Sequence, residues 1–394
     1  MRLREKLKKH LGLRGNLPAL AMSEAVSSTG WNMINVVWQP FVLSLGATMP
    51  ILGSLTGLQT ALGSGLQLVT GRISDCVGRK RLLALSYILA ITGIFLSIWA
   101  RSWLFLVPSI VVFSISGSLW EPAFSSTVAE SVEKGERGTA FSLISLAWFL
   151  PGFFAPALGG LIAERYGIRP VLGVLLVTEL SAFVLIMAYL KETLERSALD
   201  LRGIFSSLRE VLAPRFGLSR FYAVVIIDRF AWAIMEGIFL GMLLKTFNFT
   251  LIQLGVLMNV VSISAASSQM FVGKLVDRYG RRPVLIASGC IWSCALGGYL
   301  ISGSFPSFML CQALLGLAVS TWDPAVNSYL SNAVPDEERS RFFGDLNGLK
   351  GLASFPAPIL GAFLYEAHGF RAPILASFLL SLVVITLSIL VKER

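Results

Sequence analysis

One sequence element occurs twice in this chain, and its two copies lie 202 residues apart, about half of the 394-residue length. The first copy contains Gly71, Asp75, Gly78, Arg79 and Lys80, and the second contains Gly273, Asp277, Gly280, Arg281 and Arg282. The same offset holds without a gap from the pair Gln67 and Gln269 to the pair Arg169 and Arg371. Self-similarity of this length predicts two duplicated halves.

The composition indicates that these halves lie in a membrane. Apolar residues make up 55% of the chain and charged residues 14%, with a mean hydropathy of +0.71, whereas soluble domains carry roughly 25% charged residues. A helix needs about 20 apolar residues to cross the hydrocarbon layer. Twelve stretches qualify: 17–45, 50–73, 81–100, 103–131, 138–164, 169–190, 219–247, 250–275, 284–304, 305–333, 341–365 and 371–391. We therefore expect an all-α membrane protein with six transmembrane helices in each half.

The basic residues predict how the chain is oriented. They precede the first helix and follow helices 2, 6, 8 and 12, with few on the opposite side. Because cytoplasmic loops carry the excess of Lys and Arg, both termini are predicted to be cytoplasmic, in a multi-pass protein of the cell membrane. The net charge of +10 is then explained by topology and the lipid bilayer, and no nucleic-acid partner is expected.

The repeated element resembles that of a known family. A Gly-x-x-x-Asp-x-x-Gly-Arg-Lys/Arg turn after helices 2 and 8 of a twelve-helix chain is similar to the motif of the major facilitator superfamily. The first copy departs from the family motif only in having Cys76 where a basic residue is usual. The resemblance implies bundles at 1–190 and 219–394, which rock about a central cavity. Between them, the linker 191–218 has the apolar spacing of an amphipathic helix on the inner leaflet.

The motif residues are predicted to close the cytoplasmic side. The glycines of the motif allow close backbone approach, and Asp75 and Asp277 can face the positive N-terminus of a helix. The resemblance implies that this helix is helix 11 for Asp75 and helix 5 for Asp277. The alternative is that these residues are only positive-inside anchors and turn glycines. The predicted gating residues are Gly71, Asp75, Gly78, Arg79, Arg137, Gly273, Asp277, Gly280, Arg281 and Arg339.

Polar residues inside the apolar helices are the candidates for substrate and proton binding, since each is costly in lipid. Helix 1 carries a polar stripe at intervals of three or four, which puts it on one helix face, and we expect that face to line the central cavity. The resemblance places helices 1, 4, 7 and 10 around that cavity. The candidates are Glu24, Asn32, Asn35, Gln39, Glu121, Asp228, Trp232, Glu236, Asp323 and Asn327.

Three further charges lie in the predicted helices. Arg229 is expected to pair with Glu24 or another acid across the bundle, with a substrate contact as the alternative. Lys350 can form a local pair with Asp345 near the inner mouth. Glu179 lies in the middle of helix 6, which usually packs at the periphery, and the sequence offers no partner for it.

The chemistry of these candidates favours proton-coupled export of a small amphipathic or cationic organic solute. Acids outnumber bases, and a carboxyl in low dielectric can hold a proton near neutral pH; tryptophans on the same helices suit lipophilic cations. Pro156, Gly159 and Gly160 resemble the drug-antiporter element, but Phe113 stands where that branch carries an arginine. The alternatives are a metabolite or organic-ion symporter or uniporter, and a non-transporting membrane sensor. We expect no enzymatic activity, no cofactor or metal, and a monomer.

Overall fold

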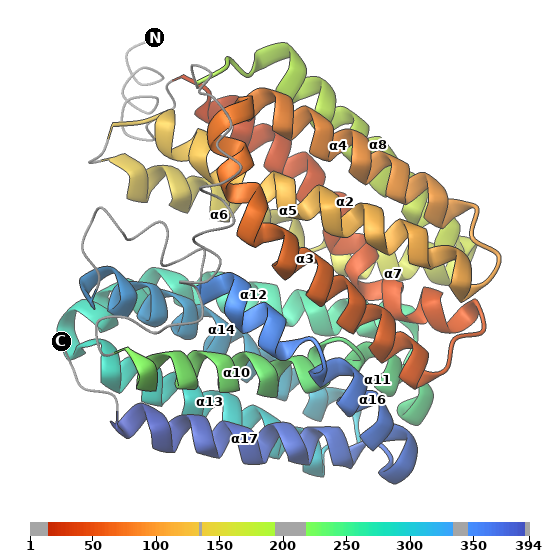
Figure 1. Ribbon diagram of the computed structural model, residues 1–394. Helices are drawn as coiled ribbons and strands as arrows, with labels where there is room; N and C mark the ends of the chain where they lie inside the picture. The colour runs from red at the N-terminus through yellow and green to blue at the C-terminus, as the bar shows by residue number, and fades with distance from the viewer. Residues whose placement is uncertain (1–14, 134–135, 194–217, 334–345, 391–394) are drawn as a thin grey trace.

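The computed structural model describes residues 15–133, 136–193, 218–333 and 346–390, with the backbone alone at 69, 71–76, 270, 272–277, 328 and 331–333. Two bundles of helices lie side by side, one from each half of the chain (Figure 1). The predicted all-α fold, with twelve helical spans in two six-helix bundles, is confirmed. The predicted linker helix falls on 194–217, outside the described residues.

The helices of the two halves follow in order along the chain. The first bundle has α2 (Leu17–Ser44), α3 (Met49–Val77), α4 (Arg79–Ile98), α5 (Leu106–Glu130), α6 with α7 (Arg137–Gly152 and Ala155–Tyr166) and α8 (Ile168–Tyr189). The second has α10 with α11 (Ser219–Glu236 and Phe239–Phe247), α12 (Leu251–Tyr279), α13 (Arg281–Ile301), α14 (Phe305–Ala333), 346–354 with α16 (Ala357–His368), and α17 (Arg371–Leu390). We call the end where α2 begins and α17 ends the terminal end, and the opposite end the far end (Figure 1).

The backbone repeats with the offset found in the sequence. Helix α12 begins and ends 202 residues after α3, and α16 does the same relative to α7. Positive φ angles recur in the same way, at Gly46 and Asn248, Gly78 and Gly280, and Gly167 and Gly369. A left-handed conformation is easiest for glycine, so these turns explain why glycine stands there in five of the six positions.

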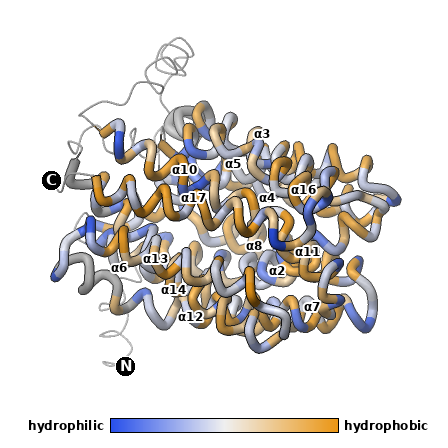
Figure 2. The backbone as a smooth tube through the Cα atoms, turned by 90° about the horizontal axis from the view of Figure 1, so that it is seen from below, coloured by the Kyte–Doolittle hydropathy of each residue, from blue (hydrophilic) through white to orange (hydrophobic). Residues whose placement is uncertain are grey.

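Eight stretches within the described residues are long and apolar enough to cross a membrane. Along the last of them, α17, hydrophobic residues predominate (Figure 2), and side chains such as Leu375 and Leu379 are exposed. The four remaining spans are α2, α3, α10 with α11, and 346–354 with α16. Each of these carries polar residues that line one of the cavities described below.

Three spans that we predicted as continuous helices are interrupted. The break between α6 and α7 and the break at 355–356 occupy equivalent positions, and prolines lie beside both. A proline lacks an amide hydrogen and its ring clashes with the preceding turn, so it interrupts a helix. The break at Gly237 and Ile238, between α10 and α11, has no proline and no counterpart in the continuous α2.

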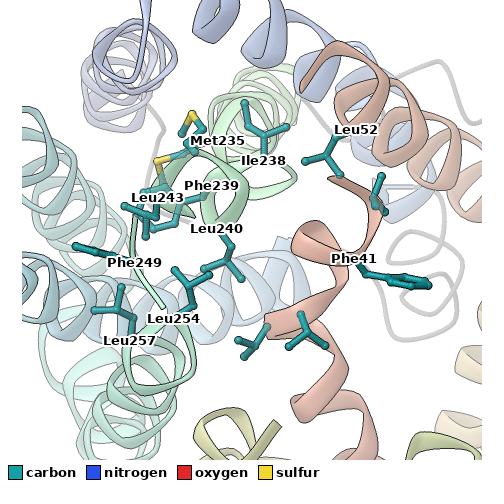
Figure 3. Close-up of a cluster of buried hydrophobic side chains, with 14 of the residues drawn as sticks. Phe41, Leu52, Met235, Ile238, Phe239, Leu240, Leu243, Phe249, Leu254 and Leu257 are labelled. Atoms are coloured by element: carbon teal, nitrogen blue, oxygen red, sulfur yellow. The ribbon is translucent and has the colours of Figure 1, made fainter. Parts of the chain in front are cut away.

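The two halves contact each other closely at the far end. A Cβ atom on Gly53 would lie 2.4 Å from the carbonyl oxygen of Pro358, and one on Gly160 would lie 2.2 Å from that of Leu251. Beside these contacts a buried apolar cluster spans both halves, with Phe41 and Leu52 from the first and Leu240, Leu254 and other residues from the second (Figure 3). Glycine therefore lets helix backbones touch across the interface.

This packing predicts that Gly53→Leu destabilises the protein, whereas Gly63→Leu on the same helix does not. A side chain at 53 would collide with the α16 backbone, while a Cβ on Gly63 meets nothing within 4 Å. Overpacking of this kind costs about 1–3 kcal/mol. The measurement is the midpoint of thermal unfolding in detergent, and equal midpoints for the two variants would contradict the interface.

Candidate functional site

A central pocket of about 490 Å³ lies between the two halves. The first half contributes Thr60, Ser64 and Gln67 from α3 and Glu121 from α5. The second half contributes most of the wall, from α10, α13, α14 and the helix at 346–354. The pocket is large enough for a small organic molecule, for which sites typically measure about 300–1,000 Å³.

Charged side chains of both signs line this central pocket. Lys350 lies close enough to Asp323, Glu121 and Asp228 for their charges to act on it, and Gln67 donates a hydrogen bond to Glu121. Among the described residues, four carboxyls (Glu121, Asp228, Glu236 and Asp323) and two cations (Lys350 and Arg229) line this pocket. The pocket keeps an excess of acidic groups if all of them are ionised.

The pairing of Arg229 corrects our expectation. Its Nη1 lies 2.9 Å from Oε2 of Glu236, seven residues on in the same helix, and not against Glu24. Both side chains are partly exposed to the pocket, at 35% and 51%, so the ion pair contributes little to stability and its groups are accessible to a ligand. The expected neighbour of Lys350, Asp345, lies outside the described residues.

Tryptophans form the apolar part of the central pocket. The rings of Trp232 and Trp292 lie 4.4 Å apart between centroids, and Trp322 lines the same pocket. The buried indole nitrogen of Trp292 makes no hydrogen bond among the described residues. Of the remaining candidates in this half, Asn327 is exposed but does not line the pocket.

We expected the polar stripe of α2 to line the central cavity. In the structure, its residues do not face one cavity. Glu24 is buried within the first bundle, where it lines a separate cavity of about 260 Å³ that also contains Glu179. Asn32 donates its amide hydrogen to the carbonyl of Ser28 on its own helix, and Asn35 is exposed. The stripe follows one helix face, but the neighbours of that face change along its length.

Gln39, the last residue of the stripe, bridges the two halves at the break between α10 and α11. Its Nε2 donates to the carbonyl of Glu236 at 3.0 Å, and its Oε1 accepts from the amide of Gly241 at 2.8 Å. Thr56 adds a hydrogen bond to the carbonyl of Gly237 at 3.3 Å. The Gln39 bridge thus supplies partners for backbone groups that the interrupted helix leaves unpaired.

Three motif residues, Arg79, Lys80 and Arg282, contact described residues of their own half. Arg79, 5% exposed, lies 3.0 Å from Glu130, and its amide donates to Glu192. Lys80 donates to the carbonyl of Met187, and Arg282, its counterpart 202 residues later, donates to that of Ile389, the counterpart of Met187. The contact made by Lys80 and Arg282 is therefore repeated in the two halves.

The other gating candidates are placed as follows. Arg137 begins α6, is exposed, and donates to the carbonyl of Ala129. Gly280 adopts a positive φ before α13. Arg281 is the first residue of that helix. Only the backbone is described at Gly71, Asp75, Gly273 and Asp277, and Arg339 lies outside the described residues.

The sequence did not identify Lys350, Gln67 and Trp292 as pocket residues, nor Glu179 as a cavity residue. The charges of Lys350 and Glu179 were visible within apolar stretches of the sequence. The residues that they approach lie on other helices, which the sequence does not show. Glu179 shares the buried face of α8 with Leu172, Leu175, Ala182 and Ile186. That helix is apolar on all sides, so the sequence pattern does not show which face packs inward.

Two related six-helix bundles with a pocket between them are the architecture of many membrane transporters. The family model of the Major Facilitator Superfamily matches residues 20–240 and 221–394, so the chain belongs to this superfamily.

The relatives include multidrug resistance proteins. The Multidrug resistance protein MdtG of Serratia proteamaculans is 25% identical over 356 residues, which cover 89% of this chain and 82% of that protein. The Multidrug resistance protein MdtG of Salmonella arizonae is 26% identical over 360 residues, which cover 89% of this chain and 83% of that protein.

Solved structures share the fold at low sequence identity. The human organic anion transporter MFSD10 (TETRAN) has a TM-score of 0.73 at 17% identity, covering 94% of this chain and 98% of that one. A POT family transporter in complex with 5-aminolevulinic acid has a TM-score of 0.78 at 11% identity, covering 95% of each chain. At these identities the likeness shows the fold alone.

The Gln39 bridge predicts that Gln39→Leu destabilises the protein. Leucine leaves the carbonyl of Glu236 and the buried amide of Gly241 without a partner, at a cost of about 1–3 kcal/mol for each unsatisfied group. Gln39→Glu can still accept from Gly241 but no longer donates to Glu236. Its stability is therefore expected to lie between that of the wild type and that of Gln39→Leu.

The matched control is Asn35→Leu, since Asn35 is on the same helix and exposed. The measurement is again the thermal midpoint in detergent. If the two leucine variants unfold at the same temperature, the bridge contributes no stability.

Proposed function

We propose that this protein exports a small amphipathic or cationic organic solute in exchange for protons. The observation that carries the proposal is the central pocket between the halves, where four carboxyls and three tryptophans line about 490 Å³. Carboxylates attract a cation, and tryptophan faces stabilise it further through cation–π contacts. The naming of the relatives as multidrug resistance proteins supports export.

Proton exchange follows from the excess of carboxyls over bases. Bringing a cation beside a protonated carboxyl favours loss of its proton, because the ionised form is then stabilised by the opposite charge. Solute and proton would therefore occupy the protein alternately, which is the requirement for antiport. Asp228, Glu236, Glu121 and Asp323 are the candidate groups in the central pocket, and Glu24 is the candidate in the first bundle.

The terminal end is assigned to the cytoplasm by its basic residues, among them Arg79, Lys80, Arg281 and Arg282. With that orientation the close contacts of the far end shut the outer side. The pocket would then be open to solute from the cytoplasm, the side from which an exporter loads. As the central pocket lies between two halves of one chain, we take the monomer as the functional unit.

A second candidate substrate class is an organic anion or zwitterion. Lys350 and Arg229 in the central pocket support it, because both are suited to bind a carboxylate. Transport of this kind would match a symporter or uniporter for metabolites. The experiment below separates it from cation export.

The test is proton release from the purified protein in weakly buffered detergent solution when solutes are added. The probes are tetraphenylphosphonium and ethidium as lipophilic cations, and benzoate and glutamate as anionic metabolite models. We expect protons to be released by the cations and the release to be reduced at least tenfold in Asp228→Asn or Glu236→Gln. Glu366→Gln serves as the control, because Glu366 is exposed on α16, outside the pocket.

Binding of the same probes is followed in parallel by the shift in thermal midpoint. Binding of anions without proton release would favour the second class and contradict antiport. Binding of cations without proton release would also contradict antiport, leaving uniport. If none of the probes binds or releases protons, cation export is wrong for these solutes, and the alternative of a non-transporting sensor gains support.

A further inference from the structure

Helices α2 and α8 of the first bundle come together at a glycine, which brings two acidic residues into one cavity. A Cβ on Gly30 would lie 2.2 Å from Oγ1 of Thr178 and 3.0 Å from Cα of Leu175. Ser27, one turn earlier on α2, then donates a hydrogen bond to Glu179, one turn after Leu175 on α8. Glu24 precedes Ser27 by three residues on the same helix, so it faces the same side.

Both carboxyl groups are withdrawn from the surface. Glu24 is 3% exposed and Glu179 is 2% exposed, and they line the same cavity of about 260 Å³. They lie close enough for the charge of one to act on the other. Two buried carboxylates in mutual repulsion are unfavourable unless a proton or a cation neutralises one of them.

The walls of this cavity provide no basic partner. Of the described residues that line it, none is Lys, Arg or His, in contrast to the central pocket with Lys350 and Arg229. Three helices packed together here contribute the titratable groups: Glu24 from α2, Tyr87 from α4 and Glu179 from α8. Helices α5 and α6 contribute the aromatic side chains Phe113, Trp120 and Trp148.

The cavity also contains a tyrosine hydroxyl group that is buried and unsatisfied. Tyr87 is 2% exposed and lines the cavity, yet its hydroxyl makes no hydrogen bond among the described residues. A buried hydroxyl without a partner is costly. Glu179 and Glu24 lie close enough to Tyr87 for their charges to act on it.

We propose that Glu24 and Glu179 form a proton-binding pair, separate from the central pocket that holds the solute. The pair shares one proton: uptake converts one carboxylate to a carboxylic acid and lowers the charge of the cavity from two negative charges to one. Tyr87 is a positioning residue whose hydroxyl stabilises the remaining carboxylate. The role of the pair in coupling rests on the proposed antiport, but the pair itself is tested without any solute.

The experiment is an infrared titration of the full-length protein over pH, which follows the C=O stretch of protonated carboxyls. The variants are Glu24→Gln, Glu179→Gln and the double substitution, and the controls are Glu236→Gln and Asp323→Asn in the central pocket. Because the two groups interact, each single substitution should remove one protonation step and move the midpoint of the other by about one pH unit or more. The control substitutions should leave both of these steps in place.

Several outcomes would overturn the proposal. If the double variant titrates as the wild type does, or if each single substitution removes its own step without moving the other, there is no shared-proton pair. Thermal midpoints of all variants are measured alongside, so that a loss of folding is recognised; Tyr87→Phe, which keeps the ring, should shift the midpoint of a step without removing one. An unchanged titration in Tyr87→Phe would exclude the positioning role.

The same variants separate this proposal from the proposed function. If wild-type protein shows both steps but releases no proton with tetraphenylphosphonium or ethidium, the pair exists and antiport of these cations is wrong. If antiport occurs and the double variant still releases protons fully, the central pocket carries the coupling proton and the pair does not. We expect the double variant to keep binding these cations and to release fewer protons than the wild type, because the carboxyls of the central pocket remain.

Discussion

Every backbone amide and carbonyl within the hydrocarbon layer must find its partner inside the protein, because lipid offers none. Continuous helices meet this requirement by themselves, but this chain interrupts three of its spans. The break between α10 and α11 is the most informative, since side chains from the other half, Gln39 and Thr56, bond to its exposed backbone groups. The same condition that makes the protein helical thus also joins its two bundles.

The sequence predicted the architecture well because the duplication leaves marks on the backbone as well as on the side chains. The offset of 202 residues that relates the motif copies also relates helix ends, turn conformations and the capping contacts of Lys80 and Arg282. Glycine at the turns and cations after the helices are local requirements, and local requirements are visible in sequence. The breaks in three spans were missed because proline does not by itself mark a break: α2 and α5 continue through Pro40 and Pro122. The break between α10 and α11 has no proline at all.

The sites were less predictable, because they depend on which helix faces meet. The stripe from Glu24 to Gln39 was visible from its spacing. Glu24, however, lines a cavity inside the first bundle, whereas Gln39 contacts the second bundle. Glu179 could not be placed, since α8 is apolar on every face and its orientation is set by the close approach of Leu175 to Gly30. The role of Lys350 as a pocket residue could not be predicted, because the sequence does not show that its helix and α14 line the same pocket.

Alternating access gives the Gln39 bridge a particular consequence. To open the far end, the halves must separate there, and the hydrogen bonds of Gln39 to Glu236 and Gly241 must break. Water then enters at the same place and bonds to the freed groups, so the net cost is about 0.5–1.5 kcal/mol per bond instead of the larger cost of an unpaired buried group. Glu236 connects this bridge to the pocket, because its carbonyl accepts from Gln39 while its carboxylate pairs with Arg229. Glu236 therefore belongs both to the wall of the central pocket and to the contacts that join the two halves.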